Sequence, residues 1–383
     1  MSEWKKVKLG EITIIKTGKL DSNAAVPNGA YPFFTCDPTT LSIDKWAYDT
    51  EAILLAGNNA SGNYTAKYYK GKFNAYQRTY IIETLNPQFA SVRYMAYAMN
   101  QQLQLLKVMS SGSTTKFLTM KMLTQLSIDL PSIETQNRIA TILSRYDSLI
   151  ENYQKQIKLL EEAAQRLYKE WFVDLHFSGH ENTKIVDGVP EGWEKKPISQ
   201  LGEYLNGFAF KPSDWQESGK PIIKIKEMGN GVSNDTPRNN GERVPAKYLV
   251  KAGDLLFSWS ATLMVIVWSG EEGWLNQHLF KVTPAKGIGR EFLLQSISNT
   301  IEEFQNLTTG STMKHIQRNK LDQVFTNVPN DEIMALYSNF AESMRNHILH
   351  LSSQISFLTE ARDRLLPQLM SGEIEAKQQS IRT

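Results

Sequence analysis

Two short segments of the sequence combine a flexible glycine, two hydroxyl side chains and a lysine, which together form a compact set of hydrogen-bond donors. Ser-Gly-Ser-Thr-Thr-Lys occupies residues 111–116, and Thr-Gly-Ser-Thr-Met-Lys occupies residues 309–314. Such donors suit phosphate oxygens. The alternative is that each segment is only a turn before a helix, with its lysine in solvent. The residues open to both interpretations are Ser113, Thr114, Lys116, Ser311, Thr312 and Lys314.

A second candidate surface mixes aromatic and basic side chains. Between residues 64 and 72 tyrosines and lysines interleave, and Trp259 and Trp274 of the second half precede polar residues in the same way. Lys and Arg bind phosphate or guanine, and Asn and Gln suit adenine edges. Any one of these residues is more often an ordinary surface or core residue. The candidate DNA contacts are Asn58, Asn59, Ser61, Tyr64, Lys67, Lys70, Lys72, Arg78, Trp259, Ser260, Thr262, Gln277 and His278.

Motifs of several enzyme classes are missing or incomplete. A DNA amino-methyltransferase needs an Asn/Asp-Pro-Pro-aromatic loop, but Asp37-Pro38 and Asn86-Pro87 lack the second proline and the aromatic residue. The P-loop pattern Gly-x-x-x-x-Gly-Lys-Ser/Thr does not occur. A metal nuclease pairs an Asp with an acidic-x-Lys element, and Glu375-Ala376-Lys377 supplies only the second part, in a polar tail. The sequence therefore predicts no catalytic residues in this chain.

A metal site is not expected either. His176 and His180 have the spacing of two ligands on one helical turn, but Gly179 and the lack of a third ligand nearby favour a helix end and a linker. Cys36 is the single cysteine, which excludes an internal disulfide and a thiolate zinc cluster. We expect no bound cofactor. One cysteine, no signal peptide and no run of about 18 apolar residues predict a cytoplasmic protein without membrane contact.

The elements that would position these residues form a long internal repeat. The two Gly-Ser-Thr segments lie 198 residues apart, and the same offset continues without a gap from Leu123 and Leu321 to Leu167 and Leu365. Upstream the match is looser, although Gln-Arg-Thr-Tyr at 77–80 resembles Gln-His-Leu-Phe at 277–280. Each half is therefore a variable domain followed by a shared helix.

Apolar residues spaced alternately by three and four predict two long helices, at about 134–172 and 331–370. Pro131 and Pro329 lie just ahead of them. Two helices of equal length and register in one chain pair most simply antiparallel to each other, as a coiled coil. The expected partner-helix interface is Ile142, Tyr146, Tyr153, Ile157, Leu160, Leu167, Phe340, Met344, Leu351, Ile355, Leu358 and Leu365, with His347 in the same seam.

The variable domains have mixed structure. Short strands are predicted at 51–56, 80–83, 222–225, 254–257 and 263–268, and helices at 92–106 and 290–304. The expected fold class is α+β (mixed α/β), with domains at 1–132 and 176–330, helices at 133–175 and 331–372, a linker at 176–190 and a flexible tail at 373–383. Residues 1–132 hold 14 basic and 9 acidic side chains, and residues 181–330 hold 17 of each. Binding to DNA would therefore require the basic residues to cluster on one face.

The organisation resembles the specificity subunits of type I restriction–modification systems over essentially the whole chain. Trp4 with Leu9-Gly10 resembles the opening of the first domain, and Val-Pro-Glu-Gly-Trp-Glu at 189–194 resembles that of the second. Glu-Thr-Gln-Asn-Arg-Ile-Ala at 134–140 resembles the start of the first shared helix, and Gln-Leu-Met-Ser-Gly-Glu-Ile at 368–374 the end of the second. The second helix departs from the pattern, because it begins with Asp-Glu-Ile-Met-Ala-Leu at 331–336.

The resemblance implies two target-recognition domains that each read one half of a bipartite, asymmetric sequence in double-stranded DNA. It also implies that the paired helices set the spacer length and dock two methyltransferase subunits. S-adenosylmethionine, ATP and Mg would then be held by these partners and by a motor-nuclease subunit. Two alternatives remain: a self-sufficient DNA-modifying or cutting enzyme, and a protein- or glycan-binding scaffold without DNA specificity.

Overall fold

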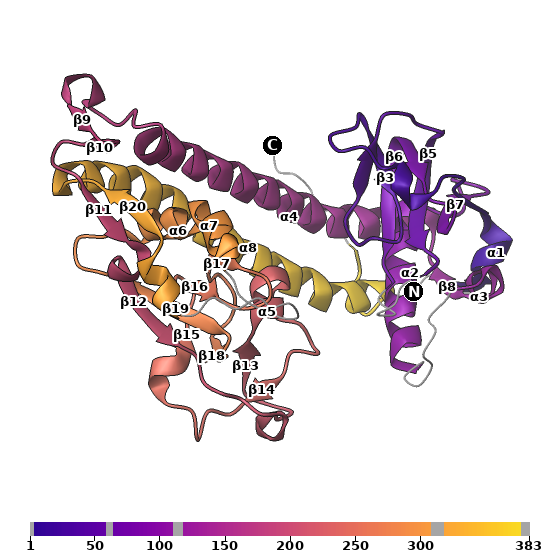
Figure 1. The fold of residues 1–383 in the computed structure, drawn as a ribbon. Coiled ribbons are helices and arrows are strands. Elements are labelled where there is room, and N and C mark those ends of the chain that lie inside the picture. Colours follow the sequence, from indigo (N-terminus) through magenta and orange to yellow (C-terminus); the bar gives the residue numbers. More distant parts are fainter. Residues whose placement is uncertain (1–3, 59–63, 110–117, 308–317, 377–383) are drawn as a thin grey trace, which may run out of the picture. The chain divides into compact units, whose positions relative to one another are not determined.

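The computed structural model describes residues 4–58, 64–109, 118–307 and 318–376 (Figure 1). The chain divides into two compact units, Met1–Leu149 with Leu358–Thr383 and Ile150–Phe357. Each unit contains one mixed α/β domain together with part of both long helices, α4 (Ile133–Tyr168) and α8 (Asp331–Met370). Among the described residues no helix is long and apolar enough to cross a membrane.

The first domain is built on a six-stranded sheet covered on one face by a helix. The strand order is β2 (Thr13–Thr17), β7 (Thr79–Thr84), β5 (Tyr48–Ala56), β6 (Ala66–Ala75), β3 (Tyr31–Phe34) and β4 (Leu41–Ile43). Side chains of β5 alternate between the faces, as strand geometry requires. Ile53 and Leu55 pack in the core that includes helix α2 (Val92–Met109), whereas Ala52 and Leu54 pack on the other face.

Shorter elements complete this domain. Strand β1 (Lys5–Lys8) pairs with β8 (Ser127–Leu130), which leads directly into α4. The helices α1 (Leu9–Ile12) and α3 (Met120–Gln125) pack beside this pair, and the 3-10 turn η1 (Ser22–Ala24) follows β2. The predicted strands at 51–56 and 80–83 and the helix at 92–106 are confirmed by β5, β7 and α2.

The second domain repeats this plan with the sheet divided in two. One sheet has the order β12 (Gly202–Asn206), β19 (Leu279–Pro284), β16 (Leu255–Ser258) and β17 (Met264–Val267). The other has the order β14 (Arg238–Asn239), β13 (Lys220–Ile223), β18 (Gly273–Leu275) and β15 (Leu249–Val250). In the first domain β6 alone pairs antiparallel with β5 and parallel with β3. In the second domain two strands share this pairing: β17 pairs antiparallel with β16, and β18 pairs parallel with β13. Residues 268–272 lie between β17 and β18.

Helices α5 (Ile225–Asn230), α6 (Arg290–Asn299) and α7 (Ile301–Asn306) belong to the second domain, as do the 3-10 turns η4 (Ile198–Gln200), η5 (Pro212–Asp214), η6 (Ala246–Tyr248) and η7 (Arg318–Asp322). Strand β11 (Glu194–Pro197) pairs with β20 (Phe325–Val328), just as β1 pairs with β8. The predicted helix at 290–304 is confirmed in two pieces, α6 and α7, which meet at Thr300.

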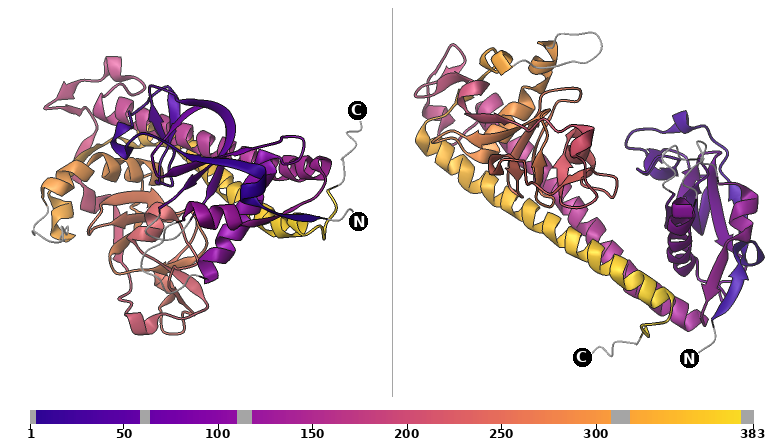
Figure 2. Two further views of the ribbon diagram at one scale, coloured as in Figure 1. Left: turned by 90° about the vertical axis from the view of Figure 1, so that its right-hand side faces the viewer. Right: turned by 90° about the horizontal axis from the view of Figure 1, so that it is seen from below.

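The long helices have the limits that the sequence predicts. The Ser132 hydroxyl accepts from the Thr135 amide at 3.3 Å, and the Asn330 side chain accepts from the Ile333 amide at 3.0 Å, so each helix begins with a capping side chain. After Tyr168, α4 continues as a π-helical turn, η2 (Lys169–Val173). Helix α8 keeps its course through Pro367, which lies in its last turn. The two helices pair antiparallel within each unit (Figure 2).

The buried seam of this pair differs from the predicted one at the start of α8. The expected interface residues on α4 are at least partly buried, as are those of α8 from Met344 to Leu365. Phe340, however, is 58% exposed and His347 is also exposed, so both predictions are wrong. Tyr337, Ala341 and Ile348 are buried instead. The reason is that the first turns of α8 pack into the core of the second domain, which sets the buried face of the helix there.

Two further segments differ from expectation. Within the expected linker, β9 (Ile185–Val186) and β10 (Val189–Pro190) form a hairpin through Asp187-Gly188, after the 3-10 turn η3 (His180–Asn182). Asp-Gly favours this two-residue turn because both residues adopt positive φ. In the expected flexible tail, Ala376 is buried, and its carbonyl accepts from Arg138 at 3.4 Å.

Candidate nucleic-acid interface

In the first domain three turns meet at the end of the sheet that carries Arg78. The amide of Gly57, just after β5, donates to the carbonyl of Arg78 at 2.8 Å. The amide of Gly18, just after β2, donates to the carbonyl of Thr79 at 3.1 Å. Arg78 lies in the short turn between β6 and β7 and is exposed. Backbone hydrogen bonds therefore hold Asn58 and Arg78, both predicted contacts, at one end of the sheet.

The second domain builds the same cluster of turns. The amide of Trp259, after β16, donates to the carbonyl of His278 at 3.4 Å, and that of Gly207, after β12, donates to the carbonyl of Leu279 at 3.0 Å. The bridge between Leu20 and Tyr76 in the first domain corresponds to the bridge between Phe208 and Asn276. We call these equivalent sets the turn clusters, comprising residues 18–20, 57–58 and 76–79 in the first domain and residues 207–208, 259–262 and 276–279 in the second.

The side chains at the two turn clusters differ. The first carries Asn58 and the exposed guanidinium of Arg78. In the second, the indole nitrogen of Trp259 donates to Asn206 at 3.2 Å, and the ring lies 5.8 Å from that of His278. Gln277 and His278 are half-buried, with their side-chain nitrogens 3.4 Å apart. The same backbone arrangement thus presents a basic surface in one domain and an aromatic and amide surface in the other.

Three further predicted contacts, Ser260, Thr262 and Tyr64, differ in how far they reach the surface. Ser260 is 3% exposed, so its side chain is buried within the second turn cluster. Thr262, two residues later, is exposed, and its carbonyl accepts from the Ser258 hydroxyl, which fixes the turn. In the first domain Tyr64 is half-buried and packs against the core under α2.

The lysines of β6 are divided between structure and surface. The Lys67 ammonium donates to the carbonyl of Pro38, and burial lowers its pKa. Lys70 lies directly across from Glu51 on β5, and their charged groups are 3.2 Å apart. An exposed pair of this kind contributes little to stability. Lys72 is exposed and lies over the Trp46 ring at 4.8 Å from its centre.

Two exposed tryptophans, Trp46 and Trp215, were not among the predicted contacts. Trp46 is 45% exposed beside Lys72, and Trp215 is 48% exposed beside Lys224, whose ammonium lies 4.5 Å from the ring centre. A solvent-exposed indole next to an ammonium can stack on a base while the cation meets a phosphate. The available signal was a tryptophan among polar neighbours, as in Asp44-Lys45-Trp46 and Asp214-Trp215-Gln216.

Several predicted contacts, namely Asn59, Ser61, Ser113, Thr114, Lys116, Ser311, Thr312 and Lys314, lie outside the described residues. Leu118, which follows the first Gly-Ser-Thr segment, is tied to the first turn cluster. Its amide donates to the Gly57 carbonyl at 3.0 Å, and its carbonyl accepts from the Tyr80 hydroxyl at 2.8 Å. Leu118 lies two residues after Lys116 in the sequence.

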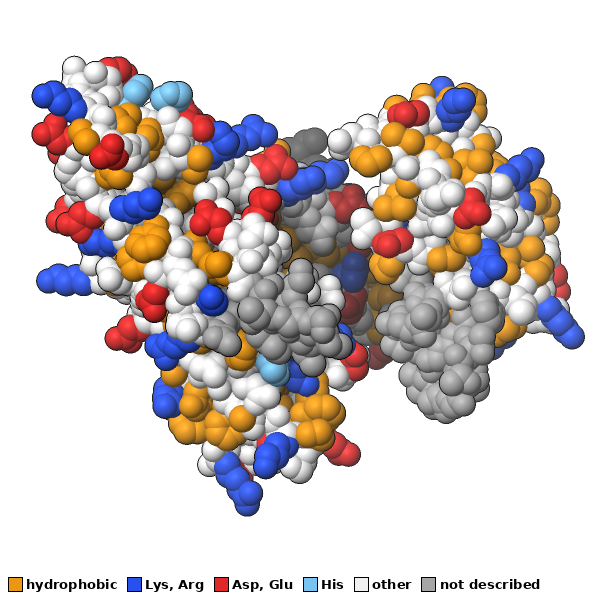
Figure 3. Space-filling view, viewed as in Figure 1, with side chains coloured by type: hydrophobic (Ala, Val, Ile, Leu, Met, Phe, Trp, Pro, Cys, Tyr) orange, Lys and Arg blue, Asp and Glu red, His pale blue; other side chains and the backbone are white. Residues whose placement is uncertain are grey.

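Figure 3 shows how charged side chains are distributed on one face of the molecule. On the face seen in Figure 3, basic side chains of both domains lie among acidic ones. Part of this basic charge is paired within each domain: Lys220 with Glu272 at 2.8 Å, and Lys16 with Glu83 at 2.6 Å. The expected clustering of basic residues on one face is not visible on this side, so the turn clusters, defined by their backbone, are the better guide to an interface.

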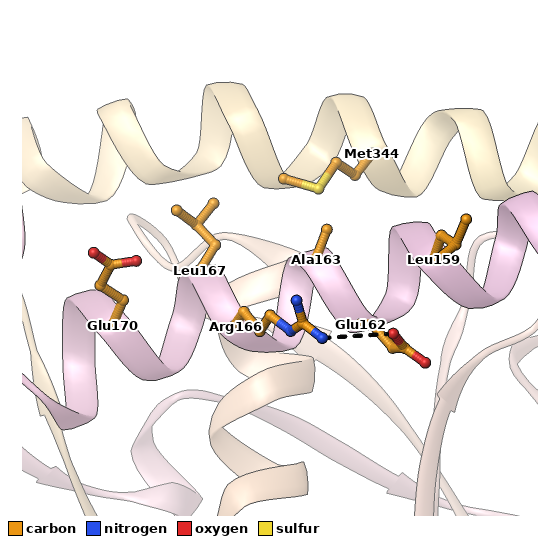
Figure 4. Close-up of a pocket in the computed structure, with 7 residues that line it drawn as sticks. All are labelled: Leu159, Glu162, Ala163, Arg166, Leu167, Glu170 and Met344. Carbon is orange, nitrogen blue, oxygen red and sulfur yellow. Dashed lines mark ion pairs between the residues drawn. The ribbon is translucent and has the colours of Figure 1, made fainter. Parts of the chain in front are cut away.

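The paired helices carry a second surface, in the unit Ile150–Phe357. Leu159, Ala163 and Leu167 of α4 point toward Met344 of α8 and line a shallow groove (Figure 4). Glu162 and Arg166 form its rim and pair at 3.8 Å. Leu159 is 64% exposed, and Phe340 lies one turn before Met344. This groove is an apolar strip bordered by charge, a combination common in protein–protein contacts.

The two histidines of the linker lie close together. The His176 and His180 rings are 5.3 Å apart, and His180 Nδ1 lies 2.9 Å from the Phe177 carbonyl oxygen. In the part of the chain that the structure describes, no group of three or more His, Cys, Asp or Glu side chains is placed to hold a metal ion.

Comparison with known proteins decides the family. A sequence model described as "Type I restriction modification DNA specificity domain" matches residues 1–162 and again residues 190–342. The chain belongs to the type I restriction–modification DNA specificity family. The two matches correspond to the two halves of the repeat, so the family domain occurs twice in this chain.

Relatives in this family include specificity subunits from Escherichia coli and Haemophilus influenzae. The specificity subunit of the type I restriction enzyme EcoDI from Escherichia coli is 38% identical over 224 residues, which cover 52% of this chain and 49% of that protein. The chain thus matches about half the length of this relative. The HindI specificity subunit from Haemophilus influenzae is 23% identical, with 98% of this chain and 100% of that protein covered.

A solved structure shares the fold. The crystal structure of the type I restriction–modification S subunit from M. genitalium superposes with a TM-score of 0.60 at 16% identity and covers 96% of both chains. At this identity the similarity shows the fold alone. It supports two tandem α/β domains and an antiparallel helix pair as the architecture of this chain.

Proposed function

We propose that this chain is the non-catalytic, sequence-specific DNA-binding subunit of a type I restriction–modification complex. Each recognition domain would bind one half of a bipartite DNA site. The observation that carries this proposal is the pair of turn clusters, which share one backbone arrangement and differ in their side chains. Backbone equivalence supports a common way of docking on the duplex, and different side chains at the base edges give different sequences.

The recognised sequence would be asymmetric. Arg78 in the first turn cluster is suited to guanine, whereas Gln277 in the second is suited to adenine. Trp46 and Trp215 would add stacking or backbone contacts, each with its neighbouring lysine. Lys116 and Lys314 would contact phosphate, as the two Gly-Ser-Thr segments suggest, and would contribute affinity without sequence preference.

The paired helices would set the gap between the two half-sites and dock two methyltransferase subunits. Continuous helices of 36 and 40 residues are rigid enough for a fixed spacer. The apolar groove of Leu159, Ala163 and Met344 supports docking of a partner helix, because its exposed apolar side chains would be buried there. S-adenosylmethionine would be held by the methyltransferase subunits, and ATP and Mg by a motor-nuclease subunit.

Mapping of methylated adenines tests the proposal directly. The full chain is expressed with a type I methyltransferase subunit with which it forms a soluble complex, and modified bases are located across the genome. Methylation in a split, asymmetric motif with a constant gap is the expected result. A soluble complex that leaves no new methylation would contradict DNA reading and favour a protein-binding scaffold.

A further inference from the structure

In the first unit, a buried glutamine of α4 holds the loop that precedes α2. The amide oxygen of Gln136 accepts from the Ser91 amide at 2.9 Å, and its amide nitrogen donates to the Phe89 carbonyl at 3.0 Å. Gln136 is fully buried, so its polar groups need partners within the protein. The first recognition domain is therefore tied to the first turn of α4 by a side chain that both donates and accepts.

Helix α2 also contacts α4 directly, through two further polar side chains. The Ser144 hydroxyl accepts from the Arg93 guanidinium of α2 at 3.4 Å, and the Asp147 carboxylate accepts from the Tyr97 hydroxyl of α2. We call Gln136, Ser144 and Asp147 the α4 contact set. This set presents an amide, a hydroxyl and a carboxylate to the first domain.

In the second unit, the corresponding contact between α6 and α8 is ionic. The Arg345 guanidinium of α8 donates to both carboxylate oxygens of Glu291 of α6, at 2.8 and 3.1 Å, and the two side chains are 6% and 1% exposed. Arg290, the first residue of α6, donates to Glu342 of α8 at 2.6 Å. Removing one partner from a buried ion pair leaves an uncompensated charge, which strongly destabilises a fold.

The two contacts occupy equivalent positions in the repeat. The offset of 198 residues relates the α4 contact set to Met334, Glu342 and Arg345 of α8, which we call the α8 contact set. The same offset relates Arg93 of α2 to Glu291 of α6. An amide on α4 is thus replaced by a thioether on α8, a hydroxyl by a carboxylate, and a carboxylate by a guanidinium. The charge at the facing position of the domain helix is reversed as well.

Apolar positions support this register. Three positions of α2 are fully buried together with their equivalents in α6: Tyr94 with Phe292, Met95 with Leu293, and Met99 with Ile297. On the long helices, the equivalent residues Ile150 and Ile348 are identical and buried. Because apolar residues fill the same positions in both halves, the pattern of apolar residues does not distinguish one helix from the other. The polar contact sets do.

Exchange of the two domains between the helices would bring like charges together. On α8, the first domain would place Arg93 where Glu291 now meets Arg345, and Met334 would offer no hydrogen bond to the loop ahead of α2. On α4, the second domain would place Glu291 beside Asp147. Like charges or unpaired polar groups at a buried contact are costly, so each exchange is unfavourable.

We propose that each recognition domain is matched to its own long helix by these contact sets, so that the unit transferable between the two halves is a domain together with the first four turns of its helix. Residues 136–147 and 334–345, which span the two sets, lie within those turns. Discrimination of this kind needs unfavourable contacts with the wrong partner as well as favourable contacts with the right one, and the contact sets provide both. The matching does not depend on DNA recognition.

A graft of the second domain onto α4, made in the full chain, tests the matching. Equivalent hydrogen bonds mark its limits: the Leu9 amide donates to the Leu126 carbonyl at 2.8 Å, and the Ile198 amide donates to the Val324 carbonyl at 2.9 Å. Residues 198–324 therefore replace residues 9–126, between β1 and β8. The mismatched graft keeps the α4 contact set. The matched graft carries Q136M/S144E/D147R, which install the α8 contact set on α4.

Both grafts also carry R362A. Arg362 of α8 pairs with Asp147 at 2.8 Å, and its equivalent on α4 is Ala164, so this substitution gives the grafted half the surroundings of the second half. Thermal unfolding followed by circular dichroism compares the two grafts. The matched graft is expected to unfold roughly 5–10 °C above the mismatched graft, because Glu291 and Arg290 regain oppositely charged partners. A matched graft that is no more stable than the mismatched graft overturns the proposal.

The native first domain provides the reciprocal control without any graft. In Q136M/S144E/D147R/R362A the α8 contact set faces this domain, and the midpoint of unfolding is expected to fall roughly 5–10 °C below that of R362A alone. Equal midpoints would mean that the first domain accepts either contact set, which also overturns the proposal. General damage to α4 would lower the stability of both chains, whereas matching predicts opposite effects of the same three substitutions on the two domains.

A consequence of the matching rests on the proposed function. The matched graft would carry the second reader in both halves, so its complex with a methyltransferase subunit is expected to methylate a motif with two identical half-sites. Stability and methylation separate the two ideas. The difference in unfolding between the grafts tests the matching whether or not the complex methylates DNA, and a lack of methylation by the unaltered chain contradicts only the proposed function.

Discussion

Gly18 and Gly207 hold the same position in the two recognition domains: a Cβ at either residue would lie 2.1 Å from a backbone carbonyl oxygen, that of Ala75 or of Asn276. The chain passes here so close to the neighbouring turn that a side chain cannot be inserted. In both domains the glycine amide also bonds to the residue that starts the next strand, Thr79 or Leu279. The turn clusters therefore depend on glycine at these two positions.

Substitution of either glycine by alanine is expected to displace its turn cluster. Because the obstructing atom belongs to the backbone, the strain must be relieved by a backbone shift, at a cost of about 1–3 kcal/mol in the free energy of unfolding. Denaturant unfolding of G18A and G207A measures this cost. The control is G229A, where the nearest atom to a Cβ is the flexible end of Met264 at 3.8 Å. Equal stability of all three variants would show that the clusters tolerate a side chain.

The two turn clusters are expected to control separate halves of the DNA motif. Replacing Arg78 with alanine removes a guanidinium that can bond to guanine, worth about 1–3 kcal/mol of discrimination at one base pair. The variant R78A should relax one half of the methylated motif, and Q277A the other half, in genome-wide methylation maps. K169A, at an ion pair with Asp174 beyond the end of α4, is the control and should leave both halves intact. Relaxation of both halves by one variant would contradict separate readers.

Lys116 and Lys314 are expected to contribute affinity rather than specificity. A lysine on a phosphate releases a counterion, so K116A and K314A should weaken binding to all sequences alike and lower the slope of log affinity against log salt by about 1 each. Fluorescence titration of the assembled complex with DNA at several salt concentrations measures both quantities. If the preferred sequence changes and the slope does not, the lysine reads a base.

Phe340 and Leu159 are expected to dock a partner subunit. Both are largely exposed, so F340S and L159S should alter the stability of the isolated chain by less than about 0.5 kcal/mol. If they anchor a methyltransferase subunit, each should lower its affinity by about 1 kcal/mol or more, measured by calorimetry. L85S, at a 55% exposed leucine of the first domain, is the control. Unchanged affinity for both variants would place the docking surface elsewhere.

The sequence predicts local elements of this fold well and their non-local pairing poorly. Helix limits near Ile133 and Met370 follow from apolar spacing and flanking prolines, both of which are short-range signals. The parallel pairing of β3 with β6, and of β13 with β18, joins segments about 40–50 residues apart. Such long-range pairing produces no periodic pattern in the sequence. Phe340 was misplaced for a related reason: the domain that packs on α8, and not the helix periodicity alone, decides which face is buried.

The site shows the same division. Of the predicted DNA contacts, Arg78 and Thr262 are exposed, but Ser260, two residues before Thr262, is buried.

The contact between Trp4 and Gly372 gives the chain a cyclic character. A Cβ at Gly372 would lie 3.3 Å from the Trp4 ring, so the end of α8 adjoins the start of the first domain, and Trp193 likewise packs against Phe172 where α4 ends. Domain and helix therefore alternate around a closed circuit with two equivalent joints. The chain itself connects Phe172 to Trp193, whereas Gly372 and Trp4 meet only through their contact. A circular permutant opened in the β9–β10 hairpin, with a linker from Ala376 to Trp4, would keep the native neighbours on both sides of each joint. Which recognition domain is encoded first is thus a matter of where the circuit is opened, and the fold itself assigns no order.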